Sequence, residues 1–471
     1  MVFSSVTFLY LFLPVFCLFY FATRDIKYKN IVICVFSAIF YALGEPTYIF
    51  LLFFNVFINF IFANAIEKRK QAKLSAKKVL IIAIVVNVLI IFIFKYLNLF
   101  CDLLNINIKR IPLPIGISFY TFQSISYVVD VYRGDSIAQK KYQDLFLYIA
   151  CFPQLIAGPI VRYKDIEEKI NNRESSIENI YDGIIRIVIG LSKKIIISNN
   201  IAVVADSLLK LNASYMSKAI GILVFICQLY FDFSGYSDIA IGLGKIIGFE
   251  YKENFNYPLI SKSQTEFFRR WHISLSTFFR DYVYIPLGGN RRGNVYVNLL
   301  IVFLATGIWH GAAWSFLIWG LWHGLFMLIE RYFRKSGKPD PFAKVPSVLK
   351  WLYTMLVVMF GWVLFKLENV PDTLAYIGAM FGRGAHGYTE FSARFYLDNK
   401  MAVLLVIGIL ASVPWKEILK GRALSVYTGF TQSAPDKSVC IIRRILLIVL
   451  FLLSMLFIVN STYNPFIYFR F

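Results

Sequence analysis

The sequence lacks the short motifs that mark the common hydrolase and zinc sites. It contains no GxSxG stretch, which would place a serine nucleophile on a strand-to-helix turn. Its four histidines are far apart, and none belongs to an HExxH pattern, in which two zinc ligands share one helix face. These absences argue against an α/β-hydrolase and against a histidine metal site, and we predict that no metal is bound.

Paired cysteines and a cleavable leader are also missing. The six cysteines form no CxxC pair and lie in or beside apolar runs, so we expect free thiols. They are Cys17, Cys34, Cys101, Cys151, Cys227 and Cys440. The first basic residue is Arg24, so no basic region precedes the apolar start, which we expect to remain as a transmembrane helix.

Acidic residues are few, with 28 Asp and Glu against 49 Lys and Arg and a net charge of +21. The basic residues stand in loops between apolar runs, which is the positive-inside pattern and not a nucleic-acid-binding face. Hydrophobic residues make up 58% of the chain, and apolar windows of roughly 15 to 25 residues recur, as membrane-crossing helices require. The predicted fold class is therefore an all-α polytopic membrane protein, with residues 1–471 in one transmembrane domain.

The charge pattern predicts about 12 crossings, with both termini outside the cytoplasm. They are expected near residues 2–22, 30–43, 47–65, 79–100, 111–130, 185–208, 219–248, 295–310, 313–330, 350–367, 401–414 and 445–461. Pro112, Pro114 and Gly116 predict a bent or broken helix within 111–130. We expect four further segments not to cross: re-entrant elements at 151–163 and 263–292, a surface helix at 164–180, and an outer surface segment at 370–396.

Two acidic residues, Asp232 and Asp238, fall inside the predicted crossing at 219–248. Acids at membrane depth are costly, so they suggest a helix that lines a polar cavity and contacts substrate. A structural hydrogen-bond network would explain them equally well.

Three of the four histidines fall between residues 272 and 323. His310 and His323 lie in an apolar stretch long enough to cross a bilayer about twice, where an ionisable group is a candidate for function. An imidazole can take a proton from a reacting hydroxyl near neutral pH, so His310 is the first candidate for a general base. The alternative is a histidine that only donates a hydrogen bond to a neighbouring helix.

Arg269 and Arg270 stand beside His272 on the predicted cytoplasmic rim. Arginines there could hold the phosphates of a coenzyme A thioester, the activated donor for an acyl transfer. Positive-inside retention is the alternative explanation for these charges.

Five motifs carry a resemblance to a known family. They are PIGISFYTFQ, FPQLIAGPI, FDFSGYSDIAIGLG, FFRRWHISLSTFFRDYVYIPLGG and GIWHG. In wording and order they resemble the membrane-bound O-acyltransferases, above all the bacterial branch that acetylates alginate and peptidoglycan or transfers D-alanine to teichoic acid. The resemblance implies a ring of helices with a central tunnel, His310 as catalytic residue and His272 as the second histidine of the site.

The resemblance also implies a reaction and its partners. A cytoplasmic acyl thioester such as acetyl-coenzyme A would be the donor substrate, with no bound cofactor, and the acceptor would be a hydroxyl on the outer side of a bacterial inner membrane. An SGNH-type extracytoplasmic acyltransferase would complete the transfer to an envelope or exported polysaccharide. The alternative from another class is a transporter or flippase whose histidines form a proton relay. His323 and His386 are expected to be dispensable for chemistry.

The C-terminal tail, residues 462–471, ends in FIYFRF. Aromatic residues there could simply anchor the chain at the membrane interface. The motif resembles a tail shared by this acyltransferase branch and the small partner protein of the teichoic acid system, which implies that Tyr468 is an acyl carrier.

Overall fold

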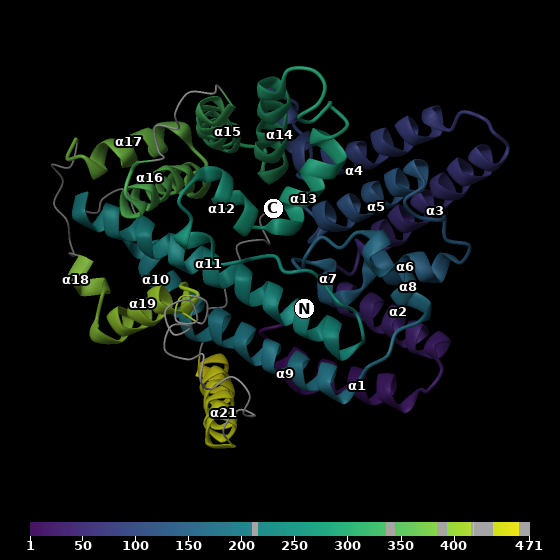
Figure 1. Cartoon of the computed structure of the whole chain (residues 1–471), viewed down its shortest axis with the longest axis horizontal. Helices are drawn as coiled ribbons and strands as arrows, with labels where there is room; N and C mark the ends of the chain where they lie inside the picture. The colour runs from purple at the N-terminus through teal and green to yellow at the C-terminus, as the bar shows by residue number, and fades with distance from the viewer. Residues whose placement is uncertain (210–214, 336–343, 384–392, 416–417, 419–436, 461–471) are drawn as a thin grey trace.

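The structure is a computed structural model that describes all residues except 210–214, 336–343, 384–392, 416–417, 419–436 and 461–471 (Figure 1). Across the described residues every regular element is a helix, which confirms the predicted all-α class. His386 and Tyr468 lie outside the described residues.

The helices of the first half of the chain are α1 (Leu13–Ala22, which continues a π-helical turn at Phe8–Phe12), α2 (Ile26–Ala42), α3 (Ile49–Gln71), α4 (Lys77–Leu103), α5 (Ile117–Arg133), α6 (Tyr142–Ala150), α7 (Phe152–Leu155), α8 (Tyr163–Asn171), α9 (Ile177–Leu191) and α10 (Asn199–Leu208). Those that follow are α11 (Tyr215–Ile246), α12 (Gln264–Arg270), α13 (Ile273–Phe279), α14 (Val295–His310), α15 (Trp314–Lys335), α16 (Ser347–Lys366), α17 (Val370–Met380), α18 (Ala393–Tyr396), α19 (Asn399–Ala411) and α21 (Lys437–Asn460). Two π-helical segments, Ser192–Ser198 and Arg280–Tyr284, continue α9 and α13, and a 3-10 turn spans Pro258–Ile260.

Several of these helices have the length and composition of membrane spans. Among the described residues, six stretches qualify: Ile49–Gln71, Lys77–Leu103, Ile177–Leu208, Ser217–Ile246, Ser347–Lys366 and Ile441–Asn460. Shorter apolar helices lie at Phe8–Ala22, Val295–His310 and Asn399–Ala411. The protein is therefore a multi-pass membrane protein, while the number of 12 crossings and the orientation of the termini stay predictions.

The two lysines in the predicted crossing at 185–208 are accommodated by ion pairs with α11. Lys194 Nζ lies 2.5 Å from Asp232 Oδ1, and Lys193 Nζ lies 2.7 Å from Asp238 Oδ2. The π-helical segment at Ser192–Ser198 carries both lysines. Because each buried charge has an opposite charge beside it, the helix can cross despite its lysines.

Two glycine pairs let the antiparallel helices α9 and α11 approach closely (Figure 1). A Cβ added to Gly190 would lie 2.6 Å from the carbonyl oxygen of Gly235, and one on Gly183 would lie 2.7 Å from that of Gly242. Real Cβ atoms do not come so near to backbone, so the backbones pack at a distance that only glycine permits.

The segments that were predicted not to cross are short helices. α7 in the first re-entrant segment has 4 residues, and α12 and α13 in the second have 7 each. None of the three has the ~20 residues that a crossing needs. α8 covers the first part of the predicted surface helix at 164–180 and buries Tyr163, Ile166 and Ile170, while residues 177–180 already belong to α9.

The predicted bent or broken helix over residues 111–130 is helical only from Ile117 onward in the structure. α5 begins only at Ile117, after Gly116, whose φ of +77° lies in the left-handed region. Pro112 and Pro114 precede the helix instead of bending it, since a proline lacks the N–H that a helix interior needs.

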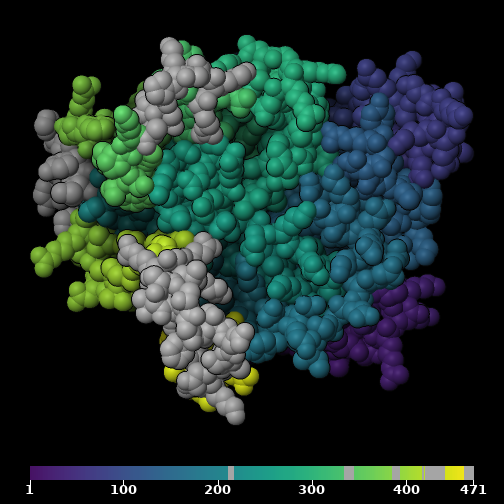
Figure 2. Space-filling model, in the orientation of Figure 1, coloured from purple at the N-terminus to yellow at the C-terminus, as the bar shows by residue number. Residues whose placement is uncertain are grey.

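The short helices α12 and α13 lie in the middle of Figure 1, with α14 and α15 above them and α11 below. Figure 2 shows the purple and blue helices of the N-terminal part on the right and most of the green helices of the C-terminal part on the left. The segment of α12 and α13, which contains His272, is therefore central (Figure 1).

Candidate active site

His310 is the last residue of α14, and its position is set by the hairpin with α15. Gly311 follows it in an extended conformation, and α15 begins at Trp314. The two helices pack backbone to backbone at Gly307 and Gly320, where an added Cβ would collide with a carbonyl oxygen of the facing helix. The hairpin therefore holds His310 at a defined depth, ~24 Å along a 16-residue helix from its start.

Aromatic rings surround the imidazole of His310, whose residue is only 5% exposed. The ring centroids of Trp309, Trp319 and Phe365 lie 4.7, 4.9 and 4.9 Å from the imidazole centroid. Dense packing of this kind restricts the imidazole to few orientations and limits the access of water.

His272 lies between α12 and α13 with a φ of 45°, which is uncommon for a residue with a side chain. Its Nδ1 is 3.1 Å from Oδ1 of Asn254, and the same oxygen accepts the backbone N–H of Ser274 at 3.1 Å. Since an amide oxygen can only accept, Nδ1 carries the proton in the neutral ring and Nε2 carries the lone pair. In this tautomer His272 can accept a hydrogen bond or a proton through Nε2.

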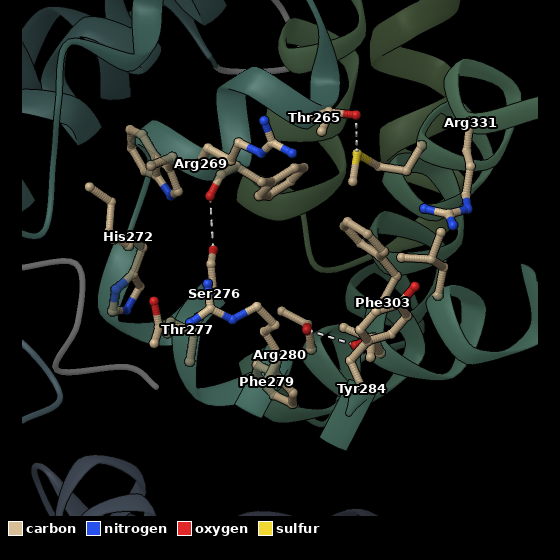
Figure 3. Close-up of a pocket in the computed structure, with 18 of the residues that line it drawn as sticks. Thr265, Arg269, His272, Ser276, Thr277, Phe279, Arg280, Tyr284, Phe303 and Arg331 are labelled. Carbon is tan, nitrogen blue, oxygen red and sulfur yellow. Dashed lines mark hydrogen bonds between the residues drawn. The ribbon is translucent and has the colours of Figure 1, made fainter. Parts of the chain in front are cut away.

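A cavity of about 410 Å³ is lined by both His272 and His310. The indole of Trp309 lies near both rings, with centroids 4.7 Å from His310 and 6.3 Å from His272. Figure 3 shows Arg269, Arg280 and Arg331 around the same opening. Two histidines and three arginines thus line one cavity.

One rim of the cavity is held together by Asn290. Its Oδ1 accepts a hydrogen bond from the Tyr284 hydroxyl at 2.7 Å and from Arg331 Nη2 at 2.8 Å. Partial burial raises the pKa of the Tyr284 phenol above its usual value, despite the opposing effect of Arg331. The phenol therefore stays a donor at neutral pH, and Arg331 is fixed at the rim.

The comparisons with known proteins agree with this geometry. The model of the membrane-bound O-acyltransferase family matches residues 140–369, which include both histidines. Over 490 residues the chain is 39% identical to a probable alginate O-acetylase of Pseudomonas putida, and the match covers 100% of both chains. The chain belongs to the membrane-bound O-acyltransferase family. It is therefore an enzyme, an O-acyltransferase.

Two further relatives belong to other envelope systems. The peptidoglycan O-acetyltransferase of Helicobacter pylori is 33% identical over 423 residues, which are 81% of this chain and 80% of that one. The teichoic acid D-alanyltransferase of Bacillus subtilis is 31% identical over 271 residues, which are 54% of this chain and 68% of that one. Family membership favours an acyltransferase over the alternative of a transporter without chemistry.

This membrane-bound O-acyltransferase brings only part of the predicted site together at the cavity. Arg269 lines it with the two histidines, whereas Arg270 Nε pairs with Glu266 at 3.0 Å. Asp232 and Asp238 form the ion pairs with the two lysines of the π-helical segment described above, which favours the structural explanation for them.

His323 also lies apart from the cavity lining. Its Nδ1 is 3.2 Å from Oε1 of Gln264, and its ring packs edge-on to Phe268. This contact is the interhelical hydrogen bond that was weighed as the alternative for an intramembrane histidine.

Two residues near the histidines were missed from the sequence. Asn254 fixes the tautomer of His272, but nothing in its local sequence indicates that contact. Lys95 donates a hydrogen bond to the carbonyl oxygen of Trp309, next to His310. Lys95 could have been found, because it is the only charged residue between Lys78 and Asp102 in a long apolar run.

Within the described ranges, no three His, Cys, Asp or Glu side chains are grouped as ligands for a metal ion. The groups at the cavity are instead bases and cations that suit a proton transfer and an anionic donor.

Proposed function

We propose that this membrane-bound O-acyltransferase moves an acetyl group from a cytoplasmic thioester to a hydroxyl group of an envelope or exported polysaccharide, with His310 as general base. The observation that carries the proposal is that His272 and His310 line one cavity together with Arg269, Arg280 and Arg331. A volume of about 410 Å³ lies in the range of small-molecule sites.

The donor would enter from the arginine side. Guanidinium groups bind phosphates through paired, charge-assisted hydrogen bonds, so the three arginines suit the phosphates of acetyl-coenzyme A or of another phosphopantetheine thioester. The thioester arm would then extend toward the histidines. Such a donor is a substrate, consumed in each turnover, and not a resident cofactor.

The transfer step can be written with His310 alone as proton carrier. His310 takes the proton of the acceptor hydroxyl while its oxygen attacks the thioester carbonyl carbon. The carbon–sulfur bond then breaks, and the leaving thiolate takes the proton from the imidazolium. His272, with its lone pair at Nε2, would hold the donor arm by accepting a hydrogen bond.

The acceptor and the cellular setting are proposed from the relatives. Alginate and peptidoglycan are the polymers named in two of them, and both are polysaccharides with free hydroxyl groups. We place the chain in a bacterial inner membrane, with both termini extracytoplasmic, and expect an SGNH-type acyltransferase on the outer side to complete the transfer. Tyr468 would carry the acyl group between the two enzymes.

The test measures thiol release by the purified full chain, given acyl-labelled coenzyme A and a hydroxyl-bearing oligosaccharide. The wild type should release free thiol, and His310→Ala should reduce the rate by about 10² to 10⁴, the usual effect of losing a general base. His323→Ala, which changes a buried histidine outside the cavity, is the matched control and should keep most of the rate. Wild-type turnover in His310→Ala would overturn the assignment of the base, and a wild type that consumes no thioester would overturn coenzyme A thioester as the donor.

A further inference from the structure

Two consecutive residues of α4, Lys95 and Tyr96, contact the end of the helix that carries His310. The ammonium of Lys95 donates a hydrogen bond to the carbonyl oxygen of Trp309. The hydroxyl of Tyr96 donates one to the carbonyl oxygen of Ile308. Both acceptors belong to the last turn of α14, directly before His310.

The end of α14 needs such donors from outside. The last four carbonyl groups of an α-helix have no partner within the helix, and lipid offers none. Many helices close their ends with a residue in the left-handed conformation, but Gly311 is extended, with φ of −178°. α4 therefore supplies hydrogen bonds that the turn after His310 does not supply.

Lys95 does more than satisfy a carbonyl group. It is 8% exposed, and its ammonium lies 5.5 Å from the centroid of the Trp309 ring, within the range of a cation–π contact. The same indole packs against the imidazoles of both His310 and His272. Lys95 thus holds the backbone and the ring that together set the position of His310.

A charged cap at the end of α14 costs more free energy than an uncharged one. A cation at membrane depth is disfavoured by several kcal/mol, and a tyrosine or serine could donate the same hydrogen bond without a charge. The negative end of the α14 dipole compensates part of this penalty. A lysine at this point is therefore better explained by the site than by the fold.

We propose that Lys95 and Tyr96 form a clamp that positions His310 for the transfer step, with Lys95 as the stronger member. The proposal rests on the proposed role of His310 as general base. Neither residue lines the cavity, so both are positioning residues and act on the reaction through the end of α14.

The first test compares Lys95→Met with Lys95→Arg in the purified full chain. Methionine keeps the length of the side chain but removes the charge and the donor, so we expect kcat to fall by about tenfold or more. KM for the thioester should stay within about twofold, because the arginines at the cavity are unchanged. Arginine keeps charge and donor and should restore most of kcat.

A second readout separates positioning from folding. Lys95→Met removes the desolvation cost of a buried cation but leaves the Trp309 carbonyl group without this donor. Because the two effects oppose each other, the variant should melt close to the wild-type temperature although it turns over slowly. Amide hydrogen exchange of residues 307–311 should become about tenfold faster, whether or not His310 is the general base. Tyr96→Phe should show the same changes in smaller measure.

The matched control is Asn98→Ala, on the same helix. Asn98 Nδ2 donates to the carbonyl oxygen of Ile111 at 2.8 Å and its Oδ1 accepts the N–H of Ile111 at 3.1 Å, away from α14. It should lower the melting temperature without lowering kcat.

Three outcomes would overturn the clamp. Lys95→Met could keep full kcat while His310→Ala is inactive, Lys95→Arg and Lys95→Met could lose activity equally, or amide exchange at residues 307–311 could be unchanged. Full activity of His310→Ala would instead refute the proposed function.

Discussion

At the scale of single residues, the two histidines of the cavity differ in what surrounds them. Aromatic rings enclose His310, whereas His272, which also packs edge-on against Phe233 at 4.7 Å, is held in addition by hydrogen bonds to Asn254 and Ser274. The first environment suits a base that must meet its substrate in one orientation, and the second suits a group whose hydrogen-bonding role is fixed by its tautomer. We therefore assign the proton transfer to His310 and the holding of the donor to His272.

This division predicts a kinetic difference between the two variants. His272→Ala should raise KM for the thioester by about tenfold, the effect of losing one hydrogen bond of about 1 to 1.5 kcal/mol, while KM for the acceptor changes little. Steady-state kinetics with each substrate varied in turn would measure both constants. Equal increases in the two KM values would contradict the division.

The residue scale is also where sequence reasoning reached its limit. Both histidines could be found, because imidazoles are rare in apolar runs and stand out there. The sequence could not show whether Arg269 or Arg270 lines the cavity. Neighbouring residues on a helix point about 100° apart, and the rotation of α12 depends on its packing. Lys95 lies 214 residues from Trp309 in the sequence, so their contact exists only in the fold.

At the scale of elements, the long pair of α9 and α11 gives the site its support. Arg186 of α9 pairs with Asp238 of α11 and with Glu253, which adjoins the Asn254 that holds His272.

The helix boundaries of α14 were predictable because Asn294 caps its start and Gly311 follows its end. The π-helical segment that carries Lys193 and Lys194 was not, because nothing in local propensity indicates it.

The glycine contacts between α9 and α11 predict a strong effect of a single methyl group. Gly190→Ala should destabilise the protein by about 1 to 3 kcal/mol, as overpacking does, because its Cβ would meet the backbone of Gly235 and Ile239. Thermal unfolding in detergent would measure the loss.

Gly378→Ala in α17 is the matched control for this change. Its Cβ would find its nearest neighbour, Arg383 Cβ, at 3.8 Å, so alanine fits and its better helix propensity should leave stability unchanged or slightly higher. Equal melting temperatures of the two variants would show that the α9 and α11 backbones can move apart without loss of stability.

At the scale of the whole molecule, the proposed function requires the acyl group to pass from one side of the membrane to the other. The basic residues of the cavity rim belong to α12, to the π-helical segment after α13 and to the end of α15, while His310 lies at the end of α14, ~24 Å from the start of that helix. That length exceeds half of a ~30 Å hydrocarbon core, so His310 would be reached more readily from the outer side. α21 stands at the edge of the molecule (Figure 1). The predicted topology assigns the tail that follows α21 in the sequence to the outer compartment.

The tail carries the last prediction, that Tyr468 accepts the acyl group from the donor before an outer partner receives it. A phenol, with pKa about 10, is a poorer leaving group than a thiol, at about 8.5, but a better one than an aliphatic hydroxyl, so each transfer would run downhill. From Asn460, eight extended residues reach up to ~28 Å, which allows Tyr468 to fold back toward His310.

Incubation with labelled acyl donor should place label on Tyr468, as seen by mass spectrometry of the C-terminal peptide. Tyr468→Phe should stop export of acyl groups without unfolding the protein, whereas Tyr463→Phe, a matched change in the same tail, should not. If the Tyr468→Phe variant exports acyl groups at the wild-type rate, the tail serves only as an interfacial anchor, and the acyl group must leave the cavity by direct transfer from the thioester to an outer acceptor.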